Sequence, residues 1–266
     1  MVTLKELLAF FEETAPKVLA EDYDNVGLLI EGQTDEICTL MLALDADEHV
    51  AQQAKAEGAE LVVSHHPLLF HPLKRITESN GTQRTALRFI RDGIGLFAMH
   101  TNFDVMGMAD AAADELKLQN REVLDITFED DIAKEGFGRL GDLPYPMTVD
   151  ECAAYVKERF HLQAVKVFGQ GSQQLVRAAI SPGSGKSMIA PAIGKGADVL
   201  ITGDIDHHEG IDAVEQGMAV IDAGHYGLEK IFVPYLQEYL KRETVKADDR
   251  ANRNLFRLIQ WKMPWE

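Results

Sequence analysis

The stretch Gly58-Ala59-Glu60-Leu61-Val62-Val63-Ser64 is followed directly by His65 and His66, and then by Pro67. A short apolar run bounded by a glycine and a hydroxyl predicts a buried strand, and the proline predicts the end of regular structure. In open α/β sheets, ligands bind at the carboxyl ends of the strands. The stretch therefore predicts a sheet strand that presents two imidazoles where a site is expected.

Strands and helices alternate on both sides of this stretch. Thr3 and Glu6 predict a capping box for a first helix that ends near Pro16. We expect strands over 37–45, 60–64, 94–99, 175–181, 198–202 and 218–222, and helices over 51–59, 83–93, 149–160, 188–197 and 208–217. This alternation is typical of the α/β class.

The second half of the sequence repeats a motif of the first half. Gly196-Ala197-Asp198-Val199-Leu200-Ile201-Thr202 parallels the opening stretch. We expect two related α/β lobes, each a sheet flanked by helices, that arose by internal duplication. The alternative is coincidence, because glycine, alanine and an acid before a strand are common in α/β proteins. The predicted lobes are 1–125 and 126–232, and residues 233–266 are expected to form a C-terminal helix and strand that pack back on the first lobe.

Composition restricts the classes of protein. The 266 residues are 46% hydrophobic and 26% charged, which excludes a mainly disordered or fibrous chain. The formal net charge of −17 disfavours nucleic acid as a partner. Cys38 and Cys152 are the only cysteines, which excludes a disulfide framework and a thiolate zinc site and suits the cytoplasm. The sequence has no uncharged apolar run long enough for a membrane span, so we expect no membrane association.

Histidines and carboxylates gather at the predicted strand ends: His65, His66, His100 and His225, with Asp104 and Glu229 four positions beyond the last two. Such nitrogen and oxygen donors suit Zn²⁺, Fe²⁺, Mn²⁺, Co²⁺ or Ni²⁺. Six protein ligands are many for one catalytic ion. We therefore expect two divalent metal ions per chain, with a shared water, at the lobe interface. The alternative is that these are surface imidazoles and a core histidine with structural roles only.

Several motifs follow one another along the chain: LAEDYDNVGLLIEG, LVVSHHPLLFHPLKRIT, MHTNFD, GFGRLG, GADVLITGDIDHHEG and DAGHYGLE. In this order they resemble the Nif-three-like family, also labelled GTP cyclohydrolase I type 2 homologs, over roughly residues 16 to 240. The resemblance implies that His65, His66, His100, Asp104, His225 and Glu229 hold a dinuclear metal centre. It also implies two related α/β lobes and a homohexameric ring. The segment Gly107-Met108-Ala109-Asp110 differs from the turn that relatives usually have at this position. The difference involves no proposed metal ligand and affects only the expectation for that turn.

Two glycine-rich motifs imitate nucleotide-binding loops. The segment 136–141 satisfies GxGxxG, but acidic residues precede it and prolines follow it, so we do not expect dinucleotide binding. The segment SPGSGKS, 181–187, lacks the first glycine of a P-loop and predicts a turn after a strand. Its amides and Lys186 can still hold an anion.

Several further polar residues have two possible roles each, one functional and one structural. Asp204, His207 and His208 are candidates for a general base or for groups that support the metal ligands, and otherwise begin a solvated helix. Lys74 and Arg75 either bind a substrate phosphate or lie on the surface. Asp24 and Asn25 either orient the site or form an Asx-type turn.

The most concrete expected function is hydrolysis that depends on the dinuclear metal centre. A water activated by the ions would attack an electrophilic carbon or phosphorus. The family label points to a nucleotide substrate and to ring opening of GTP, by resemblance only. The alternative is a non-enzymatic, metal-binding oligomeric scaffold or protein-interaction factor. Open coordination positions favour the enzyme, and closed ones favour the scaffold.

Overall fold

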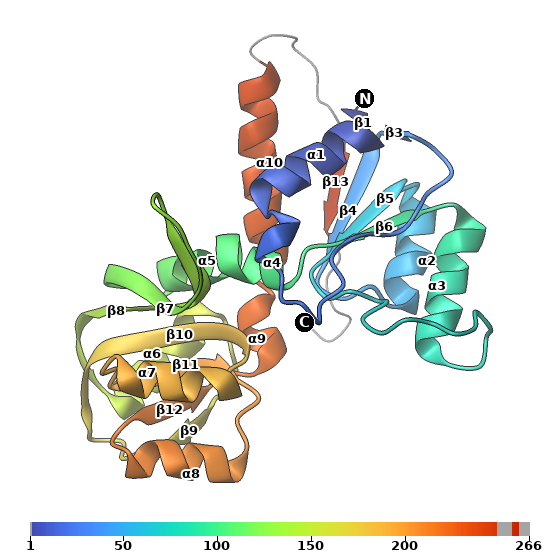
Figure 1. The fold of residues 1–266 in the computed structure, drawn as a ribbon. Coiled ribbons are helices and arrows are strands. Elements are labelled where there is room, and N and C mark those ends of the chain that lie inside the picture. Colours follow the sequence, from blue (N-terminus) through green and yellow to red (C-terminus); the bar gives the residue numbers. More distant parts are fainter. Residues whose placement is uncertain (1, 249–256, 261–266) are drawn as a thin grey trace. The chain divides into compact units, whose positions relative to one another are not determined.

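The computed structural model describes residues 2–248 and 257–260, and the chain divides into two compact units (Figure 1). The first unit comprises residues 1–103 and 232–266, and the second comprises 104–231. The first boundary thus comes before the predicted limit at residue 125. The reason is that Ala112, Ala113 and Leu116 belong to the core of the second unit. Within the predicted C-terminal segment, 249–256 and 261–266 lie outside the described residues.

The first unit is built on a five-stranded sheet in the order β13-β4-β5-β6-β2, and a small sheet joins β1 to β3. β13, β4, β5 and β6 are parallel, whereas β2 runs antiparallel to β6. The strands are β1 (Val2–Thr3), β2 (Gly27–Ile30), β3 (Glu36–Ile37), β4 (Thr39–Ala43), β5 (Leu61–Ser64), β6 (Gly95–Ala98) and β13 (Arg257–Gln260). The helices are α1 (Leu4–Thr14), η1 (Lys17–Leu19), α2 (Glu48–Glu57), α3 (Gly81–Asp92), α4 (Thr101–Phe103) and α10 (Phe232–Asp248).

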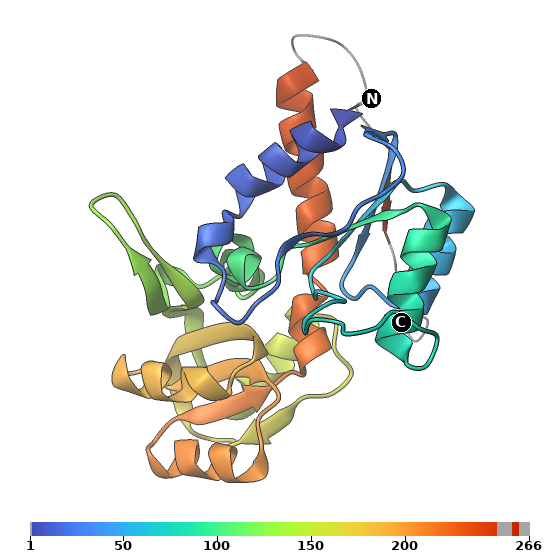
Figure 2. The same ribbon diagram turned by 45° about the vertical axis from the view of Figure 1, so that its right-hand side comes forward.

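Helices cover both faces of this sheet (Figure 2). Val50 of α2 and Phe89 of α3 pack with Leu96 on one face. On the other face Phe97, the next residue in β6, lies against Phe11 of α1 with ring centroids 4.9 Å apart. Successive strand side chains point to opposite faces, so a strand covered on both sides must be apolar throughout. This explains why the central strands read as continuous apolar runs.

The predicted start of α1 is confirmed. The Thr3 side chain accepts from the Glu6 amide, and the Glu6 carboxylate accepts from the Thr3 amide, which completes the capping box. A second capping box, formed by Thr148 and Glu151, begins the helix predicted over 149–160.

The second unit contains a six-stranded sheet in the order β7-β8-β10-β11-β12-β9. The strands β10, β11 and β12 are parallel, and β9 runs antiparallel to β12. The strands are β7 (Gln119–Glu129), β8 (Lys134–Thr148), β9 (Lys166–Phe168), β10 (Gln174–Ser184), β11 (Val199–Gly203) and β12 (Ala219–Asp222). The helices are the π-helix η2 (Asp104–Met108), α5 (Ala109–Glu115), α6 (Val149–Arg159), η3 (Lys186–Met188), α7 (Ile189–Gly194), α8 (His207–Glu215) and α9 (His225–Glu229).

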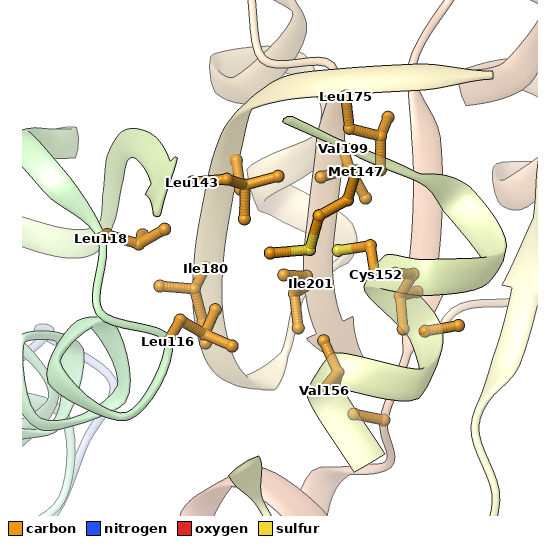
Figure 3. Packing of buried hydrophobic residues seen from close by; sticks show 14 of the residues in the cluster. Leu116, Leu118, Leu143, Met147, Cys152, Val156, Leu175, Ile180, Val199 and Ile201 are labelled. Atoms are coloured by element: carbon orange, nitrogen blue, oxygen red, sulfur yellow. The ribbon is translucent and has the colours of Figure 1, made fainter. Parts of the chain in front are cut away.

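The core of the second unit forms where α6 packs on its sheet. Figure 3 shows Cys152 and Val156 of α6 beside Ile180 of β10 and Ile201 of β11, with Met147 between them. Burial raises the pKa of the Cys152 thiol to about 12. A thiol held in its neutral form is a packing group and not a nucleophile.

The two sheets share one strand order over four strands. The first unit has β4-β5-β6-β2 and the second has β10-β11-β12-β9, and in each the last strand is antiparallel and precedes the others in the chain. The sheets differ on the other side, where β13 is parallel to β4 but β8 is antiparallel to β10. The α/β class is confirmed, and the shared order supports the internal duplication, which stays a prediction.

The repeated Gly-Ala-acid motif has the same structural role in both units. Gly58 and Gly196 adopt φ of 67° and 72°, a left-handed conformation that ends the preceding helix. The Glu60 carboxylate then accepts the amides of Cys38 and Thr39, at 3.1 and 2.7 Å. The Asp198 carboxylate likewise accepts the amides of residues 176 and 177, both at 2.8 Å. The acid therefore ties the start of each parallel strand to its neighbour.

We expect Glu60→Ala and Asp198→Ala each to lower the free energy of unfolding by about 1–3 kcal/mol, because each leaves two backbone amides without their charged acceptor. Urea unfolding followed by far-UV circular dichroism measures this change. Glu158→Ala, at an exposed position of α6, is the matched control and should stay within about 0.5 kcal/mol of wild type. If all three variants unfold alike, the carboxylates do not have this role.

Neither glycine-rich motif forms a nucleotide-binding loop. The segment 136–141 lies within β8, paired with β7 on one side and β10 on the other. In the second motif, Lys186 forms an ion pair with Glu209, which opposes an anion at that position. Among the described residues, no helix combines the length and the apolar character needed to cross a membrane.

Candidate metal centre

His65 and His66 come directly after β5, at its carboxyl end. Their amides both donate to the carbonyl of Leu44, at 3.1 and 2.9 Å, and the Ser64 hydroxyl donates to the carbonyl of His66 at 2.9 Å. Leu44 directly follows β4. The two histidines are therefore fixed against the end of the neighbouring strand.

Each of these two rings is held by its Nδ1 atom. Nδ1 of His65 lies 2.8 Å from the Met99 carbonyl oxygen, and Nδ1 of His66 lies 2.8 Å from Oδ1 of Asp45. Carbonyl and carboxylate oxygens only accept, so Nδ1 carries the hydrogen in both rings. In the neutral imidazole this leaves the lone pair on Nε2, which is the form that binds a metal.

His100 follows β6 and is held in the same way by the loop before β2. Its Nδ1 lies 2.9 Å from Oδ1 of Asp24. Oδ2 of Asp24 accepts from the amide and the hydroxyl of Thr101, at 3.1 and 2.5 Å. Oδ1 of Asn102 accepts the His100 amide, and its Nδ2 donates to the carbonyl of Ala15. These bonds join the HTN motif to the YDN motif.

The environment of Asp24 keeps its carboxylate charged. Burial raises its pKa, but the hydrogen bonds from His100 and Thr101 outweigh burial and hold the pKa at about 2. Asp24 also accepts the amide of Asn25 within its own turn. Both interpretations of Asp24 therefore apply: it orients the His100 ring, and it forms a turn with Asn25.

His65, His66 and His100 converge within the first unit. The metal-binding atoms of these three rings all lie within 4.8 Å of one another. The ring centroids are 5.0 to 5.6 Å apart. Three imidazoles whose Nδ1 atoms are all held by oxygen fit a first-row divalent metal ion.

The second unit carries a histidine of the same design. His225 begins α9, with its Nδ1 2.7 Å from Oδ2 of Asp204 and its Nε2 2.9 Å from Oε2 of Glu229. If Asp204 accepts the hydrogen on Nδ1, the Nε2 lone pair faces a carboxylate oxygen. Two lone pairs at this distance repel unless they share a cation, which is either a proton or a metal ion.

Asp222 holds the two backbone segments that carry this pair. Oδ2 of Asp222 accepts the amide of Ile205, and its Oδ1 accepts the amide of Gly224. Asp204 itself has φ of 58°, which is uncommon for a residue other than glycine. Strained backbone of this kind is found at functional sites, where the surrounding contacts maintain it.

Close backbone packing surrounds Glu229. Gly183 has φ of 78°, and a Cβ atom there would lie 2.4 Å from Oε1 of Glu229. A Cβ atom on Gly203 would lie 2.5 Å from the amide nitrogen of His225. Any side chain at either position would displace this pair, so both glycines are required by close approach.

The other predicted site residues lie as follows. Asp104 is the first residue of η2 in the second unit. His207 and His208 are exposed at the start of α8, so of the three candidates for support or general base, Asp204 is the one that contacts a predicted ligand. Lys74 and Arg75 are exposed in the first unit.

Sequence reasoning missed two acids that hold this site. Asp45 holds His66, and Asp222 holds the segments of Asp204 and His225. Both lie at or just beyond the end of a predicted strand, and that position is the signal that would have found them. No sequence pattern indicates the Met99 carbonyl, because every residue has one.

Comparison with known proteins identifies relatives of this chain. The profile of Duf34/NIF3 (NGG1p interacting factor 3) matches residues 2–254. A Clostridium perfringens protein named GTP cyclohydrolase 1 type 2 homolog is 34% identical over 228 residues, which cover 85% of this chain and 86% of that protein. A Lactococcus lactis protein of the same name is 33% identical over 243 residues, covering 90% and 91%.

Solved structures show the same fold. A Bacillus cereus protein related to NIF3 superposes with a TM-score of 0.90 at 24% identity, covering 98% of this chain and 97% of that one. Reduced HcgD from Methanocaldococcus jannaschii superposes with a TM-score of 0.80 at 29% identity, covering 98% of both chains. The family profile spans nearly the whole chain, and the relatives are covered over most of their length. The chain therefore belongs to the Duf34/NIF3 family.

Proposed function

We propose that this protein is a hydrolase that depends on two divalent metal ions, held by His65, His66, His100, Asp104, His225 and Glu229. The observation that carries the proposal is the convergence of three imidazoles, each with its Nδ1 on an oxygen acceptor. This arrangement turns Nε2 of each ring into the metal-binding atom, and the ligand atoms of the three rings lie close enough together to bind one ion.

We further propose that the ligands of the two units belong to one centre. The chain passes between the units after Phe103 and again after Ile231. Asp104 directly follows the first crossing, and Glu229 lies just before the second. Each ligand segment of the second unit is thus tied by a few residues of chain to the first unit, and His100 is four positions before Asp104.

When bound, such ions lower the pKa of water and polarise the group that water attacks. The chain supplies orientation. Asp24, Asp45 and Asp204 each accept from a histidine Nδ1 and fix the direction of its Nε2. Glu229 adds negative charge beside His225, which balances part of the charge of a cation there.

The substrate class follows from the relatives rather than from the site. Because relatives carry the name GTP cyclohydrolase 1 type 2 homolog, we propose a nucleotide, with ring opening of GTP as the first reaction to test. We also propose that the protein is cytoplasmic and forms a homohexamer. Light scattering on the purified protein tests the oligomeric state. The proposed metal is Zn, Fe, Mn, Co or Ni.

The test combines metal analysis with turnover of Glu229→Gln. Elemental analysis of untagged protein should find two ions per chain, and a nucleotide and phosphoester panel should show hydrolysis that a chelator abolishes. Glu229→Gln keeps the shape of the side chain but removes its charge, so we expect kcat to fall by at least about tenfold with little change in KM. Glu215→Gln, at an exposed position at the end of α8, is the control and should behave as wild type.

Two outcomes contradict the proposal. Unchanged turnover with the metal retained would remove Glu229 from the reaction. No turnover by wild type on any substrate, together with metal loss and a lower melting temperature in Glu229→Gln, would identify the centre as a structural element of a scaffold.

A further inference from the structure

The π-helix η2 begins with Asp104 and continues directly into α5. The π-helix is rare, and it occurs mostly as a single turn inside an α-helix, frequently at a functional site. The direction of the Asp104 carboxylate therefore depends on what holds this turn in place.

Arg139 of β8 holds the turn from outside. Its Nε and Nη2 donate to the two carboxylate oxygens of Asp110, both at 2.8 Å, in a bidentate pair. Its Nη2 also lies 3.4 Å from the carbonyl oxygen of Val105, within η2. Asp110 is in the first turn of α5, so one guanidinium contacts both η2 and the helix that follows it.

The remaining donors of Arg139 are used by its own strand. Nη1 donates to the carbonyls of Gly136 and Gly138, at 3.0 and 2.9 Å. The side chain of Arg139 is 6% exposed, so these bonds satisfy a buried charge and leave it no donor for a substrate. Arg139 is therefore a fixed part of the fold and not a mobile surface cation.

The GFGRLG motif produces this arrangement. Gly138 has φ of 63°, which turns its carbonyl toward the side chain of the next residue. A Cβ atom on Gly136 would lie 1.9 Å from the carbonyl oxygen of Asp125 in β7. The glycines thus let β8 bend around its own arginine while it stays paired with β7.

We propose that Arg139 is a positioning residue for Asp104: with Asp110 it locks the π-turn and so sets the direction of a metal-binding carboxylate. This proposal rests on the proposed function to the extent that Asp104 binds a metal ion. It gives the GFGRLG motif a role in metal binding without any contact between that motif and a nucleotide.

The experiment compares Arg139→Lys with Arg121→Lys. Arg121 is a matched control in the same unit, because its guanidinium also bonds a carboxylate and two carbonyls, those of Asp114, Leu118 and Ala113, but none of these lies in η2. Lysine keeps the charge and loses the fork of donors. Apo protein is titrated with Co²⁺ while the visible absorption spectrum is recorded, and urea unfolding is measured in chelator.

We expect Arg139→Lys to weaken binding of the Co²⁺ ion by about tenfold and to change the absorption spectrum of the bound ion. Arg121→Lys should lose stability in chelator but bind Co²⁺ as wild type does. If Arg139→Lys does not fold, Asp110→Asn is the second variant, because the Asp110 side chain is 46% exposed and asparagine keeps its shape while losing the charge and one of the two acceptor oxygens. It should weaken Co²⁺ binding by about threefold.

Three results overturn the inference. Wild-type Co²⁺ affinity and spectrum in Arg139→Lys, or in Asp110→Asn if the first does not fold, would show that the clamp serves stability alone. Equal losses of affinity in Arg139→Lys and Arg121→Lys would show a general loosening of the unit. Failure of wild type to bind Co²⁺ would overturn both this inference and the proposed function, whereas binding without hydrolysis would overturn only the enzymatic proposal.

Discussion

Replacing His100 with alanine should abolish tight metal binding. His100 is one of three imidazoles whose metal-binding atoms lie within 4.8 Å of one another, and alanine has no donor to replace it. Removal of a group that supports a ligand lowers metal affinity by roughly 10- to 100-fold, and removal of the ligand itself should lower the affinity by more than this. The measurement is metal content after dialysis, together with the melting temperature with and without added metal.

In wild type, added metal should raise the melting temperature, because an ion that binds only the folded protein stabilises it. In His100→Ala the melting temperature should not respond. His49→Ala is the matched control, since His49 is an exposed histidine on α2. Should His100→Ala retain a full complement of ions, the convergence of the three rings would have only a structural meaning.

Replacing Asp24 with asparagine should weaken metal binding by about 10- to 100-fold, although Asp24 is not among the proposed ligands. The carboxylate accepts hydrogen bonds from His100 Nδ1, from Thr101 and from Asn25. An asparagine has one oxygen and a donating amide, so it cannot accept all of them. If the amide faces Nδ1, the hydrogen of His100 moves to Nε2 and blocks the metal.

The same variant has a defined dependence on pH. The pKa of Asp24 is about 2, below its ordinary value of 3.8. Its contribution to stability is therefore fully present above pH 4 to 5 and is lost as the pH falls through about 2. In chelator, the stability of wild type minus that of Asp24→Asn should shrink as the pH falls from about 5 toward about 2.

Asp22→Asn is the control for both measurements, because Asp22 is exposed in the same loop. Isothermal titration with Zn²⁺ or Co²⁺ gives the affinities, and urea unfolding across the pH range gives the stability difference. A difference that stays constant down to pH 2, or an affinity equal to that of wild type, would contradict the role assigned to Asp24.

The order of strands and helices could be read from the sequence because its signals are local. The apolar run at Leu61–Ser64 stands between Gly58, which ends a helix, and a proline, and this pattern predicts a buried strand. The capping boxes of α1 and α6 each lie within four consecutive residues. The β7–β8 hairpin was not predicted, since its long polar strands lack a continuous apolar run and β7 is largely exposed.

The structure divides the chain before the predicted limit at residue 125, for a related reason. The helical segment after Phe103 is rich in alanine, and its sequence does not indicate which core it joins. The structure assigns it to the second unit, where Ala112 and Leu116 pack in the cluster that contains Ile180. Small apolar residues fit many cores, so packing alone decides the assignment.

The sequence by itself determined that histidines stand at the ends of parallel strands. The apolar runs and the glycines and prolines that bound them are local signals, and a residue that directly follows a strand lies at the end of that strand. Only the tertiary structure decided which oxygen holds each ring. His100 reaches Asp24 across 76 positions, His65 reaches Met99 across 34, and Arg139 reaches Asp110 across 29. No local rule pairs residues so far apart: any carboxylate or carbonyl can accept from a histidine, and only packing of the sheets and loops brings one of them within hydrogen-bonding distance.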